Sequence, residues 1–201
     1  MELHSADSGR SDRVSPARVW EKRHDVQFYD NHSYLTETVG RFLAEGIRAA
    51  QPAIVIATTP HRRAFEAELR RLGIDTASLH PLDLVWLDAR ETLSAFMEGN
   101  MPNAELFDAT VGNVFEKVVE SRRYVTVRAY GEMVDLLWRD GKPDAAIALE
   151  EMWNGLANKY AFALLCAYAK ESFEGHHSLS GIERICAAHT HVLPSRVRKE
   201  T

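Results

Sequence analysis

Residues 53–61 read AIVIATTPH, and this stretch decides the fold class. Its first five residues are all apolar, which is typical of a strand buried on both faces of a parallel sheet. Thr59 and Pro60 then favour a helix start, because threonine is a natural N-cap and proline fits the first helical position. A buried strand followed at once by a helix is half of a β–α–β unit, so we predict an α/β protein.

The same alternation extends from this stretch toward both ends of the chain. The predicted strands cover residues 25–29, 53–58, 84–88, 124–129 and 162–168. The predicted helices cover residues 35–47, 60–72, 91–98, 103–120, 132–139, 144–160 and 178–189. Since right-handed crossovers place helices on both sides of such a sheet, we predict a mostly parallel sheet of about five strands with helices on both faces.

The pattern extends over one domain, which we place at residues 23–194. Residues 1–22 are polar, rich in Ser, Arg and Asp, and without periodicity, so they are expected to form a mobile leader. Residues 195–201 are expected to form a short basic tail.

Composition excludes several classes of protein. The chain has 201 residues, of which 45% are hydrophobic and 26% charged, and its formal net charge is −5, which weighs against a basic nucleic-acid-binding face. No apolar run approaches the roughly 18–20 residues that a membrane-spanning helix needs. The first twenty residues lack the apolar core of a signal peptide, and Cys166 and Cys186 cannot form a disulfide framework. We therefore expect a cytoplasmic protein with reduced thiols.

The common catalytic motifs are missing from the sequence. The only Gly-Lys pair, Gly141-Lys142, is followed by Pro143, so there is no phosphate-binding loop of the G-x-x-x-x-G-K-[ST] type. None of the eleven glycines stands two positions from another, which removes the G-x-G-x-x-G dinucleotide motif. H-E-x-x-H and G-x-S-x-G are absent too. The sequence indicates no enzyme class and no particular cofactor.

Polar residues gather at the predicted carboxyl ends of the strands, where open parallel sheets bind ligands. The candidate ligand-binding residues are Tyr29, Thr59, His61, Arg128, Tyr130 and Glu132. Arg128 stands inside the apolar run VTVRA, so it should be paired or face a pocket, and Glu132 is its obvious partner. A ligand pocket and a purely structural Arg128–Glu132 pair both remain open.

A second constellation is Cys186-x-x-His189-x-His191. Thiolate and imidazole suit zinc or copper, but a closed site needs four ligands and this spacing supplies at most three. Cys166 or the pair His176-His177 could complete the set only if the fold brought it close. A buried cysteine with a histidine at a helix C-terminus explains the same spacing, and we favour that interpretation.

Several segments, in order, resemble one family. They are HDVQFY (24–29), LAEG (43–46), IVIATTPH (54–61), LDARETLSAFM (87–97), RAYGEMVDLLW (128–138), LEEMWN (149–154), LLCAY (164–168) and ICAAHTHVLP (185–194). Together they resemble the MEDS domain, the sensory domain of methanogen and methylotroph regulators of the DcmR kind. This resemblance implies a non-catalytic sensory module, and such modules often accompany histidine-kinase or DNA-binding output domains.

The resemblance also implies a distant likeness to RecA- and KaiC-type domains. Where their phosphate loop would stand, this chain reads FYDNHSY (28–34), with neither Gly nor Lys. A fold does not carry its function with it, so this likeness does not imply ATP binding.

We therefore expect a sensory domain of bacterial signal transduction that binds a small anionic or carbonyl-bearing molecule at the carboxyl edge of the sheet. Because the chain ends at Thr201, we expect the signal to pass through a partner, such as a histidine kinase or transcription regulator, or through a second copy. Binding is expected to bias the C-terminal helix that carries Cys186 and His189. The alternatives are a ligand-free interaction module and a residual nucleotide- or metal-dependent enzyme.

Overall fold

A six-stranded parallel sheet forms the centre of the molecule. The computed structural model describes residues 22–121, 126–173 and 178–194. The strand order is β3-β2-β6-β7-β1-β8, and every neighbouring pair in this sheet is parallel. The strands are β1 (Arg23–Tyr29), β2 (Ala53–Ala57), β3 (Leu84–Asp88), β6 (Val127–Gly131), β7 (Phe162–Ala169) and β8 (His191–Leu193). The predicted α/β class with one mostly parallel sheet is confirmed, with six strands instead of about five.

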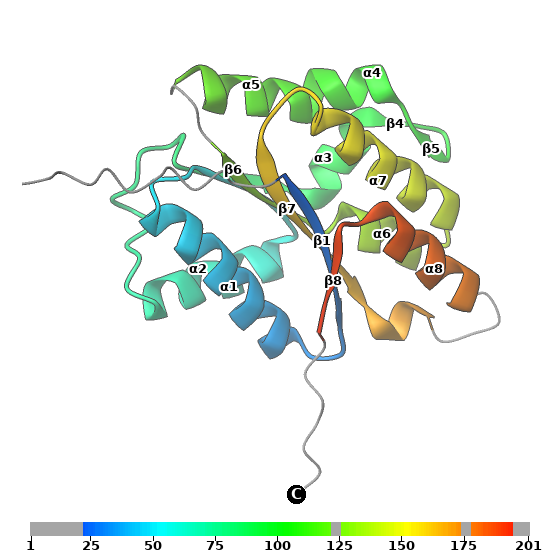
Figure 1. The fold of residues 1–201 in the computed structure, drawn as a ribbon, viewed down its shortest axis with the longest axis horizontal. Helices are drawn as coiled ribbons and strands as arrows, with labels where there is room; N and C mark the ends of the chain where they lie inside the picture. The colour runs from blue at the N-terminus through cyan, green and yellow to red at the C-terminus, as the bar shows by residue number, and fades with distance from the viewer. Residues whose placement is uncertain (1–21, 122–125, 174–177, 195–201) are drawn as a thin grey trace, which may run out of the picture.

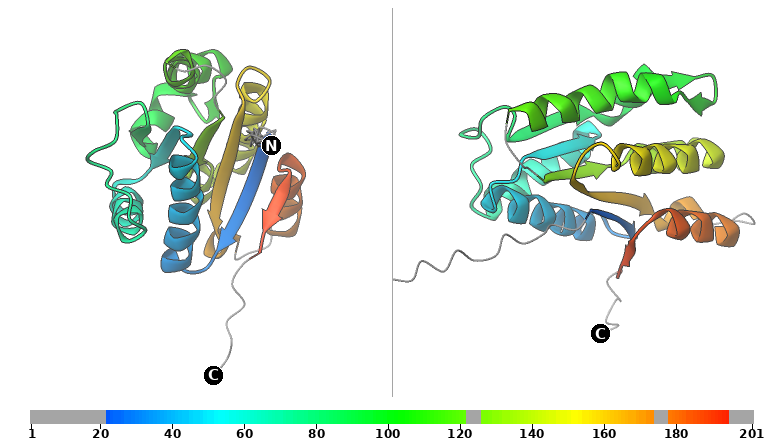
Figure 2. Two further views of the ribbon diagram at one scale, coloured as in Figure 1. Left: turned by 60° about the vertical axis from the view of Figure 1, so that its left-hand side comes forward. Right: turned by 45° about the horizontal axis from the view of Figure 1, so that its top comes forward.

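Helices cover both faces of the sheet (Figure 1). One face is covered by α1 (His32–Arg48) and α2 (Thr59–Arg71), which pack against each other. The opposite face carries α3 (Ala89–Phe96), α5 (Asn113–Glu120), α6 (Met133–Arg139), α7 (Pro143–Leu156) and α8 (Ser178–Ala188). Figure 2 shows α5, α7 and α8 side by side in its right-hand view.

The apolar runs of the central strands explain these two layers. All five residues of β2 are buried, and successive side chains point to opposite faces of the sheet. Val55 packs into the apolar cluster under α1 and α2, whereas Ile54 and Ile56 pack into the cluster on the other face. Burying one such side chain stabilises a fold by about 1.5–3 kcal/mol. The continuous apolar pattern is thus the signature of a strand between two helical layers.

Residues 97–120 differ from the prediction. The expected helix 91–98 ends at Phe96, and a short antiparallel hairpin of β4 (Met97–Glu98) and β5 (Met101–Pro102) follows. Gly99 supplies the positive φ of +60° that the hairpin turn needs. The expected helix 103–120 is divided into α4 (Ala104–Phe107), a five-residue π-helix at Asp108–Gly112, and α5.

Three boundaries and one missed strand also needed correction. Helix α2 begins at Thr59, so Thr58 is its N-cap and Pro60 occupies the second helical position. The strand predicted at 124–129 continues to Gly131, and residues 124 and 125 lie outside the described part of the chain. Helix α7 ends at Leu156, before the predicted 160. The edge strand β8 was not predicted, because it has three residues and is largely exposed.

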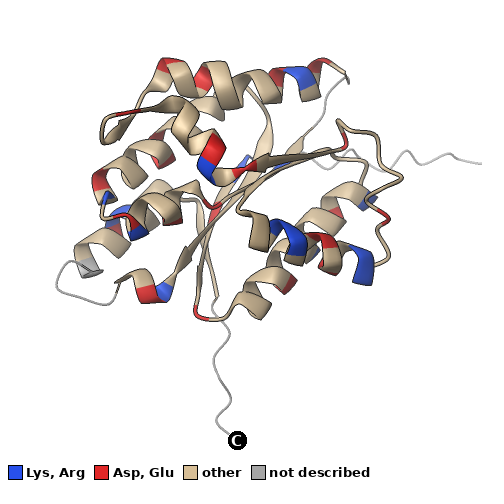
Figure 3. Cartoon of the chain, turned by 180° about the vertical axis from the view of Figure 1, so that it is seen from behind, with Lys and Arg blue, Asp and Glu red and all other residues tan. Residues whose placement is uncertain are grey.

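Charges are spread over the helices. Seen from behind in Figure 3, acidic and basic residues are interspersed, and α2 carries arginines at both of its ends. Among the described residues, none of the helices has both the length and the apolar character needed to cross a bilayer.

Candidate functional site

The site lies where the helices that follow two neighbouring strands diverge. Strands β2 and β6 pair in parallel, so their carboxyl ends share one edge of the sheet. The helix that follows β2, α2, covers one face, whereas α6, which follows β6, covers the other. In open α/β sheets the crevice at such a switch point is the usual ligand site.

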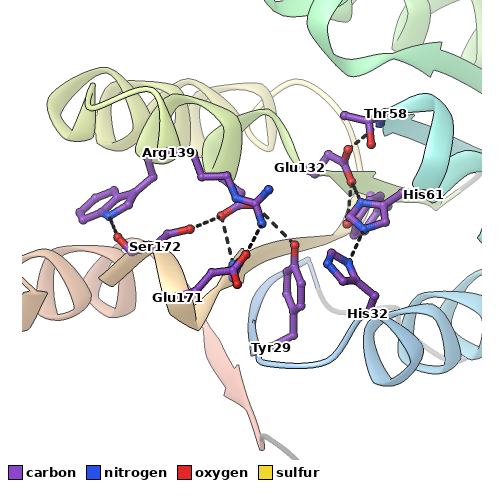
Figure 4. Close-up of polar contacts among 12 residues, drawn as sticks. Tyr29, His32, Thr58, His61, Glu132, Arg139, Glu171 and Ser172 are labelled. Carbon is purple, nitrogen blue, oxygen red and sulfur yellow. Dashed lines mark hydrogen bonds and ion pairs between the residues drawn. The ribbon is translucent and has the colours of Figure 1, made fainter. Parts of the chain in front are cut away.

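Glu132 lies at this switch point, directly after β6. Its side chain is 5% exposed, and its oxygens accept hydrogen bonds from the Thr58 backbone N–H at 2.5 Å, His61 Nδ1 at 2.5 Å and the Tyr130 hydroxyl at 3.3 Å (Figure 4). A carboxylate beside the N-terminus of α2 also interacts favourably with the helix dipole. One buried carboxylate therefore holds the start of α2 against the start of α6.

A histidine pair leads from this carboxylate to the surface. His61 Nε2 lies 3.0 Å from Nδ1 of His32, which is exposed on α1, and the His61 side chain is 15% exposed. Because Glu132 accepts from His61 Nδ1, the neutral His61 ring presents a lone pair at Nε2. When protonated, the same ring becomes a cation paired with Glu132. At the surface, the histidine pair can therefore bind either a hydrogen-bond donor or an anion.

A second buried carboxylate, Asp135, lies on α6. It accepts hydrogen bonds from the Ala169 backbone N–H at 3.0 Å, the Ser172 hydroxyl at 3.3 Å and the Tyr29 hydroxyl at 3.5 Å, and it lies 3.1 Å from Arg139 Nε. Figure 4 shows Tyr29 between this group and the His61 group. Burial, assisted by the Asp135 charge, raises the pKa of the Tyr29 phenol, which therefore stays a donor at neutral pH.

Asp135 predicts a pH dependence of stability. Burial raises the pKa of its carboxyl above the ordinary 3.8, so between these two values the folded state binds more protons than the unfolded state. The free energy of unfolding should therefore fall as pH rises through this window, by at most about 1.4 kcal/mol per unit for one group. Urea unfolding of wild type and Asp135→Asn at several pH values measures the difference. The raised pKa of Asp135 would be contradicted if, relative to the variant, the free energy of unfolding of the wild type rose with pH in this window.

The structure brings most of the predicted ligand residues together. Tyr29, His61, Tyr130 and Glu132 meet at one edge of the sheet, and Thr59 is exposed at the first position of α2. His32, Asp135 and Arg139 were missed. Asp135 and Arg139 stand one turn apart on α6. The spacing of an acidic and a basic residue at i and i+4, just after a predicted strand, could have indicated this ion pair from the sequence.

Arg128 does not belong to this site, and the expected Arg128–Glu132 pair is wrong. Arg128 is the second residue of β6, and its Nε donates to Gln51 Oε1 at 2.8 Å while its guanidinium lies over Phe42. Four residues along a strand span about 13 Å, so Glu132 lies toward the opposite end of β6.

The three sequence-based metal candidates do not form one group. Cys186 is partly exposed on α8, and His191, in β8, has its Nδ1 3.1 Å from Asp25 Oδ1. His189 alone is buried among other potential metal ligands, which come from β1, α7 and β7: His24, Glu150 and Cys166.

Comparison with known proteins identifies the family. The model of the MEDS domain, described as the methanogen/methylotroph, DcmR sensory domain, matches residues 23–190. The comparison with curated proteins found no match. The matched range covers the whole sheet up to the start of β8, including both buried carboxylates of the site. The chain therefore belongs to the MEDS family of sensory domains.

Proposed function

We propose that this protein is a non-catalytic sensory domain that binds a small molecule at the carboxyl ends of β2 and β6. The observation that carries the proposal is Glu132, a buried carboxylate at the switch point of the sheet that connects through His61 to the exposed His32. Two buried carboxylates and a tyrosine with a raised pKa within one crevice are typical of a functional site.

The chemistry of the crevice favours a small ligand with a carbonyl or carboxylate group. His32 offers a ring N–H donor, and His61 offers one at Nε2 only as the cation, whose positive charge Glu132 can stabilise when an anion binds. Arg63, early in α2, adds a positive charge near this helix start, whereas Arg62 is paired with Glu66. The ligand would replace the contact between the two imidazoles.

The contacts around Asp135 offer a route to the C-terminal helix. Tyr29 and Ser172 both contact Asp135 on α6, and Trp138 of the same helix donates from Nε1 to the Ser172 carbonyl at 3.2 Å. Gly181 of α8 packs so closely on Trp138 that a Cβ there would lie 2.5 Å from the ring. A ligand that moves Tyr29 would bias α6 and α8, and a partner such as a histidine kinase, a transcription regulator or a second copy would bind the altered surface.

Thermal shift measurements test the ligand site. We expect formate, acetate or pyruvate, or a neutral aldehyde or ketone in the same panel, to raise the Tm of wild type and not that of His61→Gln. His80→Gln is the matched control. His80 is an exposed histidine in the segment before β3, outside the site, so this variant should keep the wild-type Tm shift. Equal shifts in wild type and His61→Gln would place binding elsewhere, and no shift with any probe would count against this ligand class.

A ligand-free interaction module is the second candidate. Met101 and Leu106 are 46% and 38% exposed, unusually so for large apolar residues. A cavity of about 330 Å³ has walls that include Glu105 and Phe107, the sequence neighbours of Leu106, together with Met152 and Leu156. Apolar side chains of this kind mark contact surfaces when they gather. If Met101→Lys keeps the oligomeric state and the partner binding of the wild type, this surface is excluded as a contact surface.

A further inference from the structure

Four metal-binding side chains meet in the interior, away from the crevice. They are His24 on β1, Glu150 on α7, Cys166 on β7 and His189, just after α8. One ligand atom from each lies within 4.8 Å of all the others. The side chains of Glu150 and His189 are fully buried, Cys166 is buried, and His24 is 8% exposed. Burial of so many polar atoms requires a compensating interaction.

Three of the distances within the cluster are close to those of tetrahedral coordination. His24 Nε2 lies 3.4 Å from Cys166 Sγ and 3.1 Å from Glu150 Oε2, and these two atoms are 3.4 Å apart. His189 Nε2 lies 3.4 Å from Glu150 Oε1. For zinc-ligand bonds of about 2.0–2.3 Å, a regular tetrahedron places neighbouring ligand atoms roughly 3.3–3.7 Å apart. His24, Glu150 and Cys166 therefore need little movement to hold one ion, and Nε2 of His189 lies within 4.8 Å of their ligand atoms.

Hydrogen bonds outside the cluster orient both imidazoles. Asn154 donates through Nδ2 to the Ala188 carbonyl, so its Oδ1 is the atom that faces His24 Nδ1, at 2.9 Å. His189 Nδ1 lies 2.6 Å from the Ile185 carbonyl. Both acceptors require a proton on Nδ1, so in each neutral ring the Nε2 lone pair points into the cluster. A second N–H bond of this kind is a regular companion of histidines that bind metal.

The interior of the cluster lacks donors. Tyr168 donates to Glu150 Oε1 at 2.7 Å, which leaves Oε2 facing the Nε2 of His24. Two nitrogen lone pairs and a carboxylate oxygen then meet with a single thiol proton among them. His189 Nε2 is buried and has no hydrogen-bond partner among the described residues. A cation at the centre would satisfy all four atoms at once.

The geometry points to a buried site for one zinc-class divalent transition-metal ion, held by His24 Nε2, Glu150 Oε2, Cys166 Sγ and His189 Nε2. Mixed nitrogen, oxygen and sulfur donors suit Zn²⁺ and its spectroscopic substitute Co²⁺. Because four protein ligands complete a tetrahedron, no position remains for a substrate, and the ion has a structural or sensory role.

The site joins segments that are distant in sequence. It connects β1 and β7 in the sheet with α7 and with the chain that leaves α8 for β8. A cavity of about 160 Å³ reaches His24 from the outside, between Asn154 and Thr190. An ion that enters through this cavity would meet His24 first. Metal binding would thereby fix the C-terminal helix on the sheet.

Metal titration tests the site directly. Wild-type protein stripped with a chelator and given CoCl₂ should bind one equivalent and show thiolate-to-cobalt charge-transfer absorption with tetrahedral d–d bands. ZnCl₂ should abolish these bands by competition and raise the Tm. Cys166→Ser should lose the charge-transfer absorption. Asn154→Ala, which removes the contact that orients His24 together with the bond to the Ala188 carbonyl, should weaken binding about 10- to 100-fold.

Cys186→Ser and His191→Gln are the matched controls, because they change the same residue types outside the cluster and should behave as wild type. The inference is overturned if the wild type binds less than a tenth of an equivalent of either ion. It is also overturned if Cys166→Ser and His189→Gln keep full affinity, or if Cys186→Ser is the variant that loses the charge-transfer absorption. The wild-type cobalt spectrum remains decisive should a ligand variant fail to fold.

Discussion

Glu132→Ala is expected to lower the free energy of unfolding by about 3–5 kcal/mol, because each buried hydrogen-bond donor left without its acceptor costs about 1–3 kcal/mol. The substitution leaves the Thr58 N–H, His61 Nδ1 and the fully buried Tyr130 hydroxyl without their acceptor. Each hydrogen bond to a charged group contributes about 1.5–3 kcal/mol. Urea unfolding with an unchanged m-value measures the loss.

Two further variants make this prediction specific. Glu132→Gln keeps an oxygen for Thr58 and should cost less than the alanine variant, because His61 can change tautomer to accept from the new amide. Glu171→Ala is the control: its side chain is 71% exposed and its pair with Arg139 should contribute at most about 1 kcal/mol. A Glu132→Ala loss no larger than that of Glu171→Ala would show that Glu132 does not hold the two helices together.

The fold could be predicted because the decisive information is local. The apolar runs of β2 and β7 span whole strands. The residues that follow each run favour a helix or a turn, so the local signals are consistent with one another. Strand β8 has no such signal, since its three residues depend on pairing with Asp25–Gln27 on β1. The π-helix at Asp108–Gly112 lies within an otherwise regular helical pattern, so periodicity alone indicated one continuous helix.

The site was only partly predictable, and Arg128 shows why. Ending the strand at Ala129 placed Arg128 at the ligand edge, whereas the strand runs two residues further and starts only one residue before Arg128. Strand boundaries predicted from sequence are uncertain by a few residues. An error of this size places a side chain at the carboxyl end of a strand when it lies near the amino end. Glu132 kept its place because it follows the strand under either boundary.

The buried cluster could be assembled only in part from sequence, which indicated His189 and Cys166 as candidate ligands but neither His24 nor Glu150. His24 and Cys166 stand 142 residues apart and meet only because β1 and β7 pair in parallel. Glu150 stands beside Glu151, and only the packing of α7 shows that Glu150 is the one that faces inward. The local spacing of Cys186, His189 and His191 indicated one member of this cluster, His189, and two residues that lie outside it.

Trp153→Ala is expected to be the most destabilising change outside the sites, at about 3–5 kcal/mol. Trp153 is 1% exposed on α7, and its ring centroid lies 5.3 Å from that of Phe107 and 6.2 Å from those of Phe115 and Phe162. Removing the indole would open a cavity among three aromatic rings that are already packed edge to face or tilted. Urea unfolding measures the loss.

Trp153→Phe separates the packing of the ring from its polar N–H. Nε1 of Trp153 is buried and has no hydrogen-bond partner among the described residues, and an unpaired buried donor costs about 1–3 kcal/mol. The phenylalanine variant removes this cost while keeping most of the ring contacts, so its loss should be well below that of alanine. Trp86→Ala is the control, because Trp86 is only partly buried and its face is covered by Arg62. Equal losses in the two Trp153 variants would mean that the indole N–H has an acceptor and that its hydrogen bond, rather than the ring, stabilises α7.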